Sequence, residues 1–348
     1  MAQVGPYRRP ASRVPSAGRL VNILLGIAIS AALLVWLFWN VDLRAVAARL
    51  GDTQWGWLAV SIALNLSSLW ARAVRWRHLF PQGAHPTHLL NAVVIGYMGN
   101  NLLPLRAGEV VRVYVVARRG QQFWTTVTTL VVERALDGLA VGIVLAFVFL
   151  LIPTPREVAW AAEIFVALVL TMLVVLMAIT AAPLPCRILI HSLAYRWPNI
   201  ERRMLVIFDT MSDGLQGMRR PSQLLPTAIW SIAIWAVIVG SVWTCFQAAR
   251  LDLPVTAALC VIAFIGLGVS LPSSPGFIGV IQAATVLALS FFGIGKADAL
   301  GFSLLLHASQ FVPVTLWGLL LLVVEHMSLT EAARAGGASE MKSREKLT

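Results

Sequence analysis

The sequence predicts an all-α polytopic membrane protein with about six full spans and two broken or re-entrant helix hairpins, about eight membrane elements in all. Of its 348 residues 58% are hydrophobic and only 12% are charged, whereas soluble domains carry about 25% charged residues. Several apolar runs reach the length of a membrane-crossing helix, about 18 residues or more. A β-barrel is not expected, because its strands would be short segments of about 10 residues with alternating polarity.

The apolar runs divide the chain into one transmembrane domain with polar ends. Residues 1–19 are predicted to be a disordered head, 20–326 the transmembrane domain and 327–348 a polar tail. Within the domain, a polar connector at 183–222 separates a first half, 20–182, from a second half, 223–326. An apolar stripe at helical spacing in this connector predicts a helix on the membrane surface or on the protein's own face. The full spans are predicted at 20–40, 55–76, 123–152, 160–182, 224–246 and 297–324, the broken segments at 87–112 and 254–292, and a short interfacial helix at 42–50.

The distribution of basic residues predicts the orientation of the chain. The net charge is +11, and the basic residues flank apolar spans, which argues for membrane headgroups as partners and against nucleic acid. The predicted layout places most of the 27 lysines and arginines on one side. The exceptions are Arg134, inside a span, and, on the other side, Arg44, Arg49, Arg156, Arg250 and Lys296. Both termini are therefore expected to be cytoplasmic, with the protein in the cell membrane.

Two helix-breaking stretches share an outline. Residues 99–112 read Gly-Asn-Asn-Leu-Leu-Pro-Leu-Arg-Ala-Gly-Glu-Val-Val-Arg, and residues 268–279 read Gly-Val-Ser-Leu-Pro-Ser-Ser-Pro-Gly-Phe-Ile-Gly. Proline ends or kinks a helix, and glycine lets backbones approach closely. The residues predicted to form these broken-helix motifs are Pro104, Gly108, Pro272, Ser273, Ser274, Pro275, Gly276 and Gly279. Since the stretches would enter the membrane from opposite sides, the halves are candidates for an inverted-topology repeat; the alternative is that these residues only repair two kinks.

The charges of the first stretch predict a site for a phosphate-bearing headgroup. On a helix that begins after Pro104, residues three apart lie on one side, and guanidinium groups bind phosphate in a bidentate manner. The predicted headgroup-binding residues are Asn100, Asn101, Arg106, Glu109 and Arg112. The alternative is a solvated salt-bridge cluster.

A second charged cluster, Glu133, Arg134 and Asp137, lies inside a predicted span. Exposure of these groups to lipid would be very costly, so they must face protein or a water-filled cavity. They are expected either to pair structurally with Arg106 or Arg112, or to include a carboxylate coupled to protons or ions.

Other polar residues carry weaker signals. Gln282, His307 and Gln310 are candidates to line a cavity, with packing as the alternative for His307. No metal site, cofactor or catalytic residue is expected, because the three cysteines and the histidines lack metal-ligand spacing and the common catalytic motifs are missing. The sequence therefore predicts a protein that is not an enzyme.

Three segments resemble the signatures of the lysylphosphatidylglycerol synthase transmembrane-region family, also described as flippase-like or UPF0104 proteins. They are residues 100–109, Glu133-Arg134 with Asp137, and residues 271–279, in order across nearly the whole chain. The resemblance implies a multi-span membrane domain with re-entrant elements, which in the best-understood branch moves aminoacylated phosphatidylglycerol made by a separate soluble domain. No such synthase domain is recognisable in this sequence. Where the family often has glycine and glutamate, this chain has Phe277 and Gln282, so a coupling carboxylate is not expected there.

We therefore expect a membrane protein that moves, or helps to move, an anionic lipid or lipid-linked molecule between leaflets, with a separate lipid-synthesising enzyme as a partner. Two alternatives stay open: a membrane-embedded transferase acting on a phospholipid or polyprenyl substrate, and a non-catalytic subunit of an envelope-lipid pathway.

Overall fold

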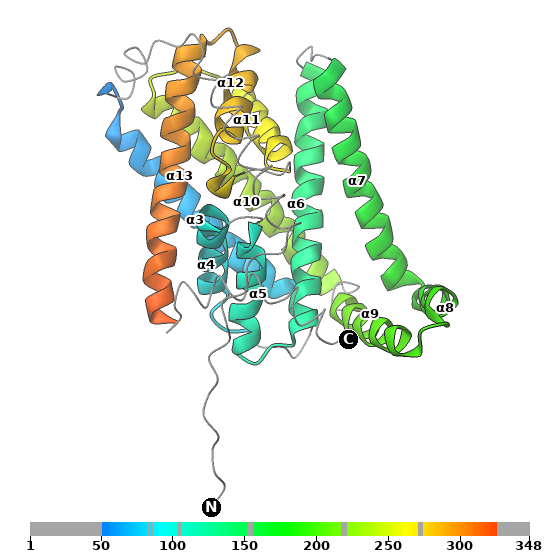
Figure 1. Ribbon diagram of the computed structural model, residues 1–348. Helices are drawn as coiled ribbons and strands as arrows, with labels where there is room; N and C mark the ends of the chain where they lie inside the picture. The colour runs from blue at the N-terminus through cyan, green and yellow to red at the C-terminus, as the bar shows by residue number, and fades with distance from the viewer. Residues whose placement is uncertain are drawn as a thin grey trace, which may run out of the picture.

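The computed structural model describes residues 51–81, 84, 86–103, 106–151, 156–216, 221–270 and 274–325, and over these residues the chain is helical (Figure 1). Five helices are long and apolar enough to cross a membrane, and they confirm five of the predicted spans. They are α3 (Trp55–Leu79), α6 (Phe123–Leu151), α7 (Arg156–Ala181), α10 (Pro221–Ala248) and α13 (Lys296–Val324). The predicted head, first span, interfacial helix at 42–50 and tail lie outside the described residues.

Helices α3 and α10 form an antiparallel pair. Near the start of α3, the backbone N–H of Gln54 donates to the carbonyl of Ala248 at the end of α10, at 2.8 Å. About two turns further along α3, the hydroxyls of Ser61 and Ser241 each donate to the other residue's carbonyl, at 2.8 and 2.9 Å. These polar groups are satisfied without water, as a helix pair within lipid requires.

The first broken segment is a hairpin of two short helices, α4 (Leu89–Leu102) and α5 (Gly108–Arg118), in the lower half of Figure 1. Helix α4 has 14 residues and is therefore about 21 Å long, too short to cross a hydrocarbon core of about 30 Å. A Cβ atom on Gly108 would overlap the carbonyl oxygen of Gly96, so only glycine allows α5 to approach α4 this closely. Pro104 lies outside the described residues.

The second broken segment is a hairpin in the upper half of Figure 1. It comprises α11 (Val255–Gly268), the 3-10 helix η3 (Pro275–Phe277) and α12 (Val280–Ser290). Gly276 and Gly279 have positive φ angles, +69° and +86°, which glycine adopts readily. Pro272 and Ser273 of the predicted motif lie outside the described residues.

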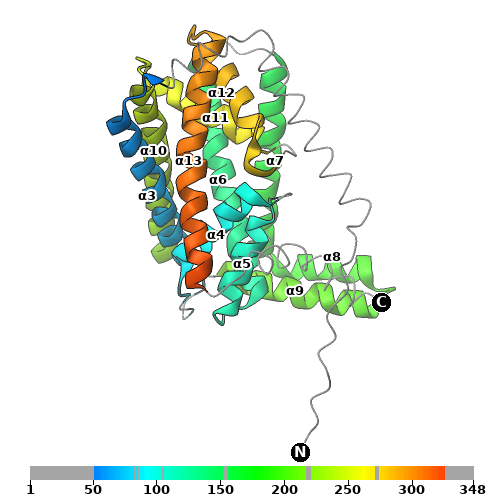
Figure 2. The ribbon, with the colours of Figure 1, turned by 60° about the vertical axis from the view of Figure 1, so that its left-hand side comes forward.

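Each hairpin has its own buried cluster of apolar side chains. Around the second hairpin, this cluster includes Leu145 of α6, Phe246 of α10 and Phe302 of α13. Around the first, it includes Trp76 of α3 and Leu322 of α13. Helix α13 passes both hairpins and packs in both clusters, as the two ribbon views show (Figures 1 and 2).

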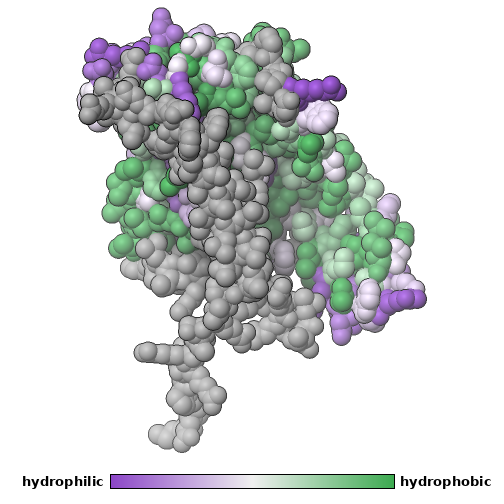
Figure 3. All heavy atoms as spheres, turned by 45° about the horizontal axis from the view of Figure 1, so that its top comes forward, coloured by the Kyte–Doolittle hydropathy of each residue, from purple (hydrophilic) through white to green (hydrophobic). Residues whose placement is uncertain are grey.

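Helices α8 (Pro183–Ala194) and α9 (Pro198–Gln216) form a further helix hairpin, which lies crosswise to the long helices (Figure 2). It accounts for most of the polar connector predicted at 183–222. In Figure 3 hydrophobic residues cover much of the visible flank of the spans, and hydrophilic residues gather toward the ends. This distribution is typical of a polytopic membrane protein.

Candidate functional site

The tips of the two membrane hairpins meet near the middle of the molecule. A Cβ atom on Gly276 would lie 3.2 Å from the carbonyl oxygen of Asn101 and 2.8 Å from the ring of Phe311. The guanidinium of Arg106, from the loop that joins α4 to α5, lies 5.2 Å from the ring centroid of Phe277. The two helix-breaking stretches, far apart in sequence, are therefore neighbours in space.

Side chains fasten both tips to α13. From the first hairpin, the amide nitrogen of Asn101 donates to the hydroxyl of Thr315 at 2.9 Å. From the second, the Oε1 atom of Gln282 accepts from the backbone N–H of Gly279 at 2.7 Å, and its Nε2 atom lies 2.9 Å from Nδ1 of His307. This geometry makes Nδ1 an acceptor and places the imidazole proton on Nε2. Gln282 thus caps α12 and holds it to α13.

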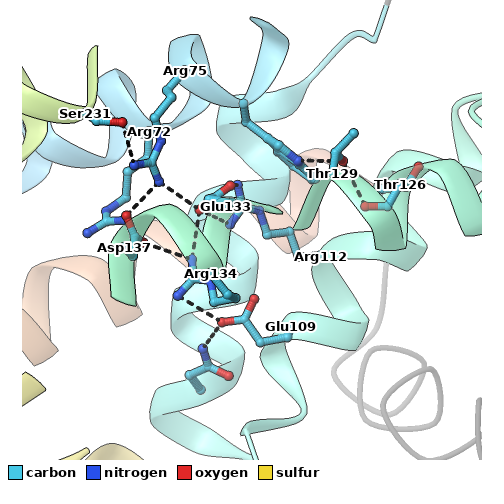
Figure 4. Close-up of polar contacts among 12 residues, drawn as sticks. Arg72, Arg75, Glu109, Arg112, Thr126, Thr129, Glu133, Arg134, Asp137 and Ser231 are labelled. Atoms are coloured by element: carbon cyan, nitrogen blue, oxygen red, sulfur yellow. Dashed lines mark hydrogen bonds and ion pairs between the residues drawn. The ribbon is translucent and has the colours of Figure 1, made fainter. Parts of the chain in front are cut away.

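Glu133 of α6 lies at the centre of a buried ion network (Figure 4). Its two oxygens accept from Nη1 and Nη2 of Arg112 at 2.9 and 2.7 Å, an end-on bidentate pair. Arg134 donates to the same carboxylate at 2.8 Å, and Nη2 of Arg75 lies 3.7 Å away. The side chain of Glu133 is completely buried, so its charge depends wholly on these partners.

One helical turn later on α6, Asp137 joins the network to α3. Its oxygens lie 2.6 Å from Nη1 of Arg72 and 2.8 Å from Nη2 of Arg75. Arg75 also donates to the hydroxyl of Ser231 on α10, at 3.3 Å. The carboxylates of α6 therefore connect α3, α5, α6 and α10 in a single network.

Aromatic rings complete the surroundings of the buried arginines. The guanidinium of Arg112 lies 3.8 Å from the ring centroid of Trp76, whose indole N–H donates to the hydroxyl of Thr129 at 3.0 Å. Arg72 lies 5.7 Å from the ring centroid of Tyr97. Stacking of this kind suits the weakly hydrated guanidinium.

One side of the network, beside the hairpin tips, is open. The side chains of Arg134 and Glu109 are 37% and 26% exposed, with Nη1 of Arg134 3.6 Å from Oε1 of Glu109. Asn100 donates to that same oxygen at 3.2 Å. Three buried atoms here have no hydrogen-bond partner among the described residues: Nε of Arg134, Oε2 of Glu109 and Oδ1 of Asn100. Arg106 is exposed nearby. These three atoms are themselves covered, and the accessible polar groups of the open side belong to Arg106, Arg134 and Glu109.

Among the described residues, the charges of this region do not balance. Within the network, Arg72, Arg75, Arg112 and Arg134 face three carboxylates, those of Glu109, Glu133 and Asp137. Arg106 adds a further positive charge beside the tips. The described part of this region therefore has an excess of positive charge.

A separate polar cluster joins the hairpin α4–α5 to the end of α13. Glu325 accepts from Asn91 and from Arg119, both at 2.8 Å, and lies 3.4 Å from His88. Burial acts to raise the pKa of Glu325, but the hydrogen bonds from Asn91 and Arg119 and the charge of Arg119 outweigh it, so the pKa lies below its usual value. This cluster fixes the helix ends and was not anticipated from the sequence.

The structure corrects the predicted arrangement of Arg106, Glu109 and Arg112. These residues do not share one helix face, because α5 begins only at Gly108 and Arg106 precedes it with φ at +54°. Arg112 is buried and bound to Glu133, which is the structural pairing weighed as an alternative. Arg106 and Glu109 lie at the open side. Gln310 is partly buried on α13.

Arg72 and Arg75 were missed as members of the site. The sequence places them near the end of a predicted span, where arginines commonly anchor a helix in headgroups. In the structure both are buried and bind Asp137. A signal was present, since Arg72, Arg75, Trp76 and Leu79 recur at helical spacing, and all four are buried on one face of α3, while Arg77 is exposed.

Long apolar helices with short apolar helices between them define the chain as a polytopic helical membrane protein. Residues 23–318 match the family described as the lysylphosphatidylglycerol synthase TM region, and the chain belongs to this family.

The chain also resembles two named proteins at low sequence identity. The chain is 24% identical to the protein named glycosyltransferase AglD of Haloferax volcanii, over 95% of this chain and 58% of that protein. It is 22% identical to a UPF0104 membrane protein of Methanothermobacter thermautotrophicus, over 80% of this chain and 85% of that protein. No solved structure shows a significant match to the chain. The match with AglD covers less than two thirds of the length of that protein.

Proposed function

We propose that this protein moves an anionic lipid or lipid-linked molecule between membrane leaflets. One observation carries the proposal: the tips of two hairpins from opposite ends meet beside a network with excess positive charge and a partly exposed side. Broken elements that meet near the midplane are the way many transporters build a site reachable from both sides. The basic end, where α5 and α13 finish, would face the cytoplasm, in keeping with the positive-inside rule.

In this proposal the arginines have two different tasks. Arg106 and Arg134, at the open side, would donate to a phosphate group, because guanidinium and phosphate form strong charge-assisted hydrogen bonds. Arg72, Arg75 and Arg112 would hold Glu133 and Asp137 and keep the site rigid. Movement of the two hairpin tips relative to each other would expose the site alternately to each leaflet.

The test uses purified protein in proteoliposomes with fluorescent phosphatidylglycerol, whose movement between leaflets is followed by chemical quenching from outside. Wild-type vesicles are expected to exchange the lipid faster than protein-free vesicles. Arg106→Ala removes an exposed side chain, so the protein should fold, and the loss of a charge-assisted contact of about 1.5–3 kcal/mol predicts a rate at least about tenfold lower.

Arg77→Ala is the matched control, since Arg77 is an exposed arginine of α3 outside the network. This variant should exchange lipid at the wild-type rate. If Arg106→Ala retains the wild-type rate, or if wild-type vesicles exchange no faster than empty ones, the proposal is wrong.

A transferase acting on a phospholipid or polyprenyl substrate is the second candidate, favoured by the name of the Haloferax relative. Incubation of the purified protein with membrane lipids and sugar donors, followed by mass spectrometry, distinguishes the two. A new glycolipid product would support the transferase, and exchange without a product would support translocation. The partners in translocation would be membrane lipids and a separate enzyme that makes the substrate.

A further inference from the structure

Helices α8 and α9 form an arm that extends sideways at the level where α6 begins and α7 ends (Figures 1 and 2). One ion pair, Arg187 to Asp209 at 3.3 Å, and a hydrogen bond between Nδ1 of His191 and Glu201 at 2.7 Å hold its helices together. Helix α9 packs against α6 and buries Phe208. The arm is therefore a fixed part of the fold with a defined outer surface.

The outer surface of the arm is strongly apolar. Large apolar side chains of the arm are more than half exposed: Leu184, Ile188, Leu189 and Leu193 of α8, Trp197 between the helices, and Val206 of α9. Soluble proteins rarely expose so many large apolar side chains within so short a segment. These side chains are therefore expected to contact lipid or another protein surface and not water.

The position of the arm indicates what that neighbour is. Only Ala182 separates α7, a membrane span, from the start of α8, so the apolar surface of the arm continues the lipid-facing surface of α7. The arm lies crosswise to the spans at one end of them (Figure 2). Amphipathic helices in this orientation lie where acyl chains give way to headgroups. Tyr195 and Trp197, exposed between α8 and α9, are the residue types that favour this depth.

The charge of the arm indicates which headgroups it meets. Arg196, Arg202 and Arg203 are exposed. Asp209 is paired with Arg187 of α8, so between residues 196 and 209 the three exposed arginines exceed the one remaining carboxylate, that of Glu201. An amphipathic helix that combines exposed apolar residues with exposed arginines binds anionic lipid surfaces.

We propose that the α8–α9 arm is a docking surface for anionic phospholipid headgroups, which it gathers beside α6 and α7. The experiment places a bimane label at Leu193→Cys in a Cys186→Ser background, with the buried Cys245 and Cys260 left in place. The full-length protein is reconstituted in vesicles of equal parts phosphatidylcholine and phosphatidylglycerol, with bromine on the acyl chains of one lipid at a time. Quenching by each brominated lipid reports its share of the contacts at the arm.

Both brominated lipids are expected to quench, and phosphatidylglycerol about twofold more or better, because each arginine near the surface favours anionic lipid. The preference should disappear as salt rises from about 0.1 M to about 1 M, where screening shortens electrostatic attraction to a few ångströms. The charge reversal Arg202→Glu with Arg203→Glu should abolish it. The reversal Arg77→Glu with Arg118→Glu, also on exposed positions, should leave it unchanged.

Two results would overturn the proposal. Absence of quenching by either lipid would show that protein or water, and not the bilayer, covers the arm. Equal quenching by the two lipids at low salt in the otherwise unaltered protein would show that the arm binds membrane without a preference for anionic headgroups. The salt series needs no charge variant, so it decides the question even if the reversal impairs folding.

Discussion

Neutralising Glu133 is the sharpest test of the buried network. Glu133→Gln keeps the shape of the side chain but removes its charge while Arg112, Arg134 and Arg75 remain around it. The new amide also directs two N–H donors toward guanidinium donors, so at least one short contact with Arg112 becomes repulsive. Breaking one side of a buried ion pair costs about 3–5 kcal/mol, and the complete burial of Glu133 predicts a loss in that range.

The measurement is the free energy of unfolding in lipid bicelles, with Glu109→Gln as the control. Glu109 belongs to the same network but is 26% exposed, so its loss should cost about 1 kcal/mol or less. The double variant Glu133→Gln with Arg112→Gln should lose less than the sum of the single variants, because the two groups act as one pair. A loss at Glu133 no greater than that at Glu109, or simple additivity with Arg112, would refute this account of the network.

Three further predictions concern packing, pH and backbone strain. Gly108→Ala should lower stability by about 1–3 kcal/mol through overpacking against α4, whereas Gly56→Ala, with open space around the site, should change thermal unfolding little; equal effects would contradict the close approach. Because the pKa of Glu325 is lowered in the folded protein, its ionised carboxylate stabilises the fold fully above about pH 4.3, and this stabilisation is lost as the pH falls below that value. In thermal unfolding at several pH values, Glu325→Gln should remove this part of the pH dependence. An acid profile that Glu325→Gln leaves unchanged would count against the prediction. Phe277→Gly should relieve a φ of +57°, which favours the folded state by about 1–2 kcal/mol. The same change removes the ring contact with Arg106, which costs about 0.5–1 kcal/mol. A loss of stability well above 1 kcal/mol in thermal unfolding would show that the ring contributes more than that contact.

The long helices and the glycine positions could be predicted because each depends on a local signal. An apolar run of sufficient length predicts a span wherever it packs, and five predicted spans are present among the described residues. Gly108 was identified from its spacing after a proline, and in the structure a side chain there would overlap α4. In both cases a few neighbouring residues hold the whole signal.

The partners of the buried charges could not be predicted in this way, because pairing depends on which helices meet. Arg72 and Arg75 looked like residues at the end of a span, yet α3 continues to Leu79 and holds them inside the protein opposite Asp137. The conformation of Arg106 was missed for a related reason. Its positive φ arises in the loop between α4 and α5, whereas the three-residue spacing had suggested a continuous helix.

The strength of the contacts limits how the halves can move in the proposed transport cycle. Separating α5 from α6 would break the Arg112–Glu133 pair inside an apolar surrounding, at a cost of several kcal/mol. The hairpin tips are held together by weaker contacts, such as the ring of Phe277 beside Arg106, worth about 0.5–1 kcal/mol. The neutral bond of Asn101 with Thr315, which holds the first tip to α13, is of the order of 1 kcal/mol. A motion that exposes the site alternately to each leaflet would therefore part the tips while α3, α5 and α6 move as one body.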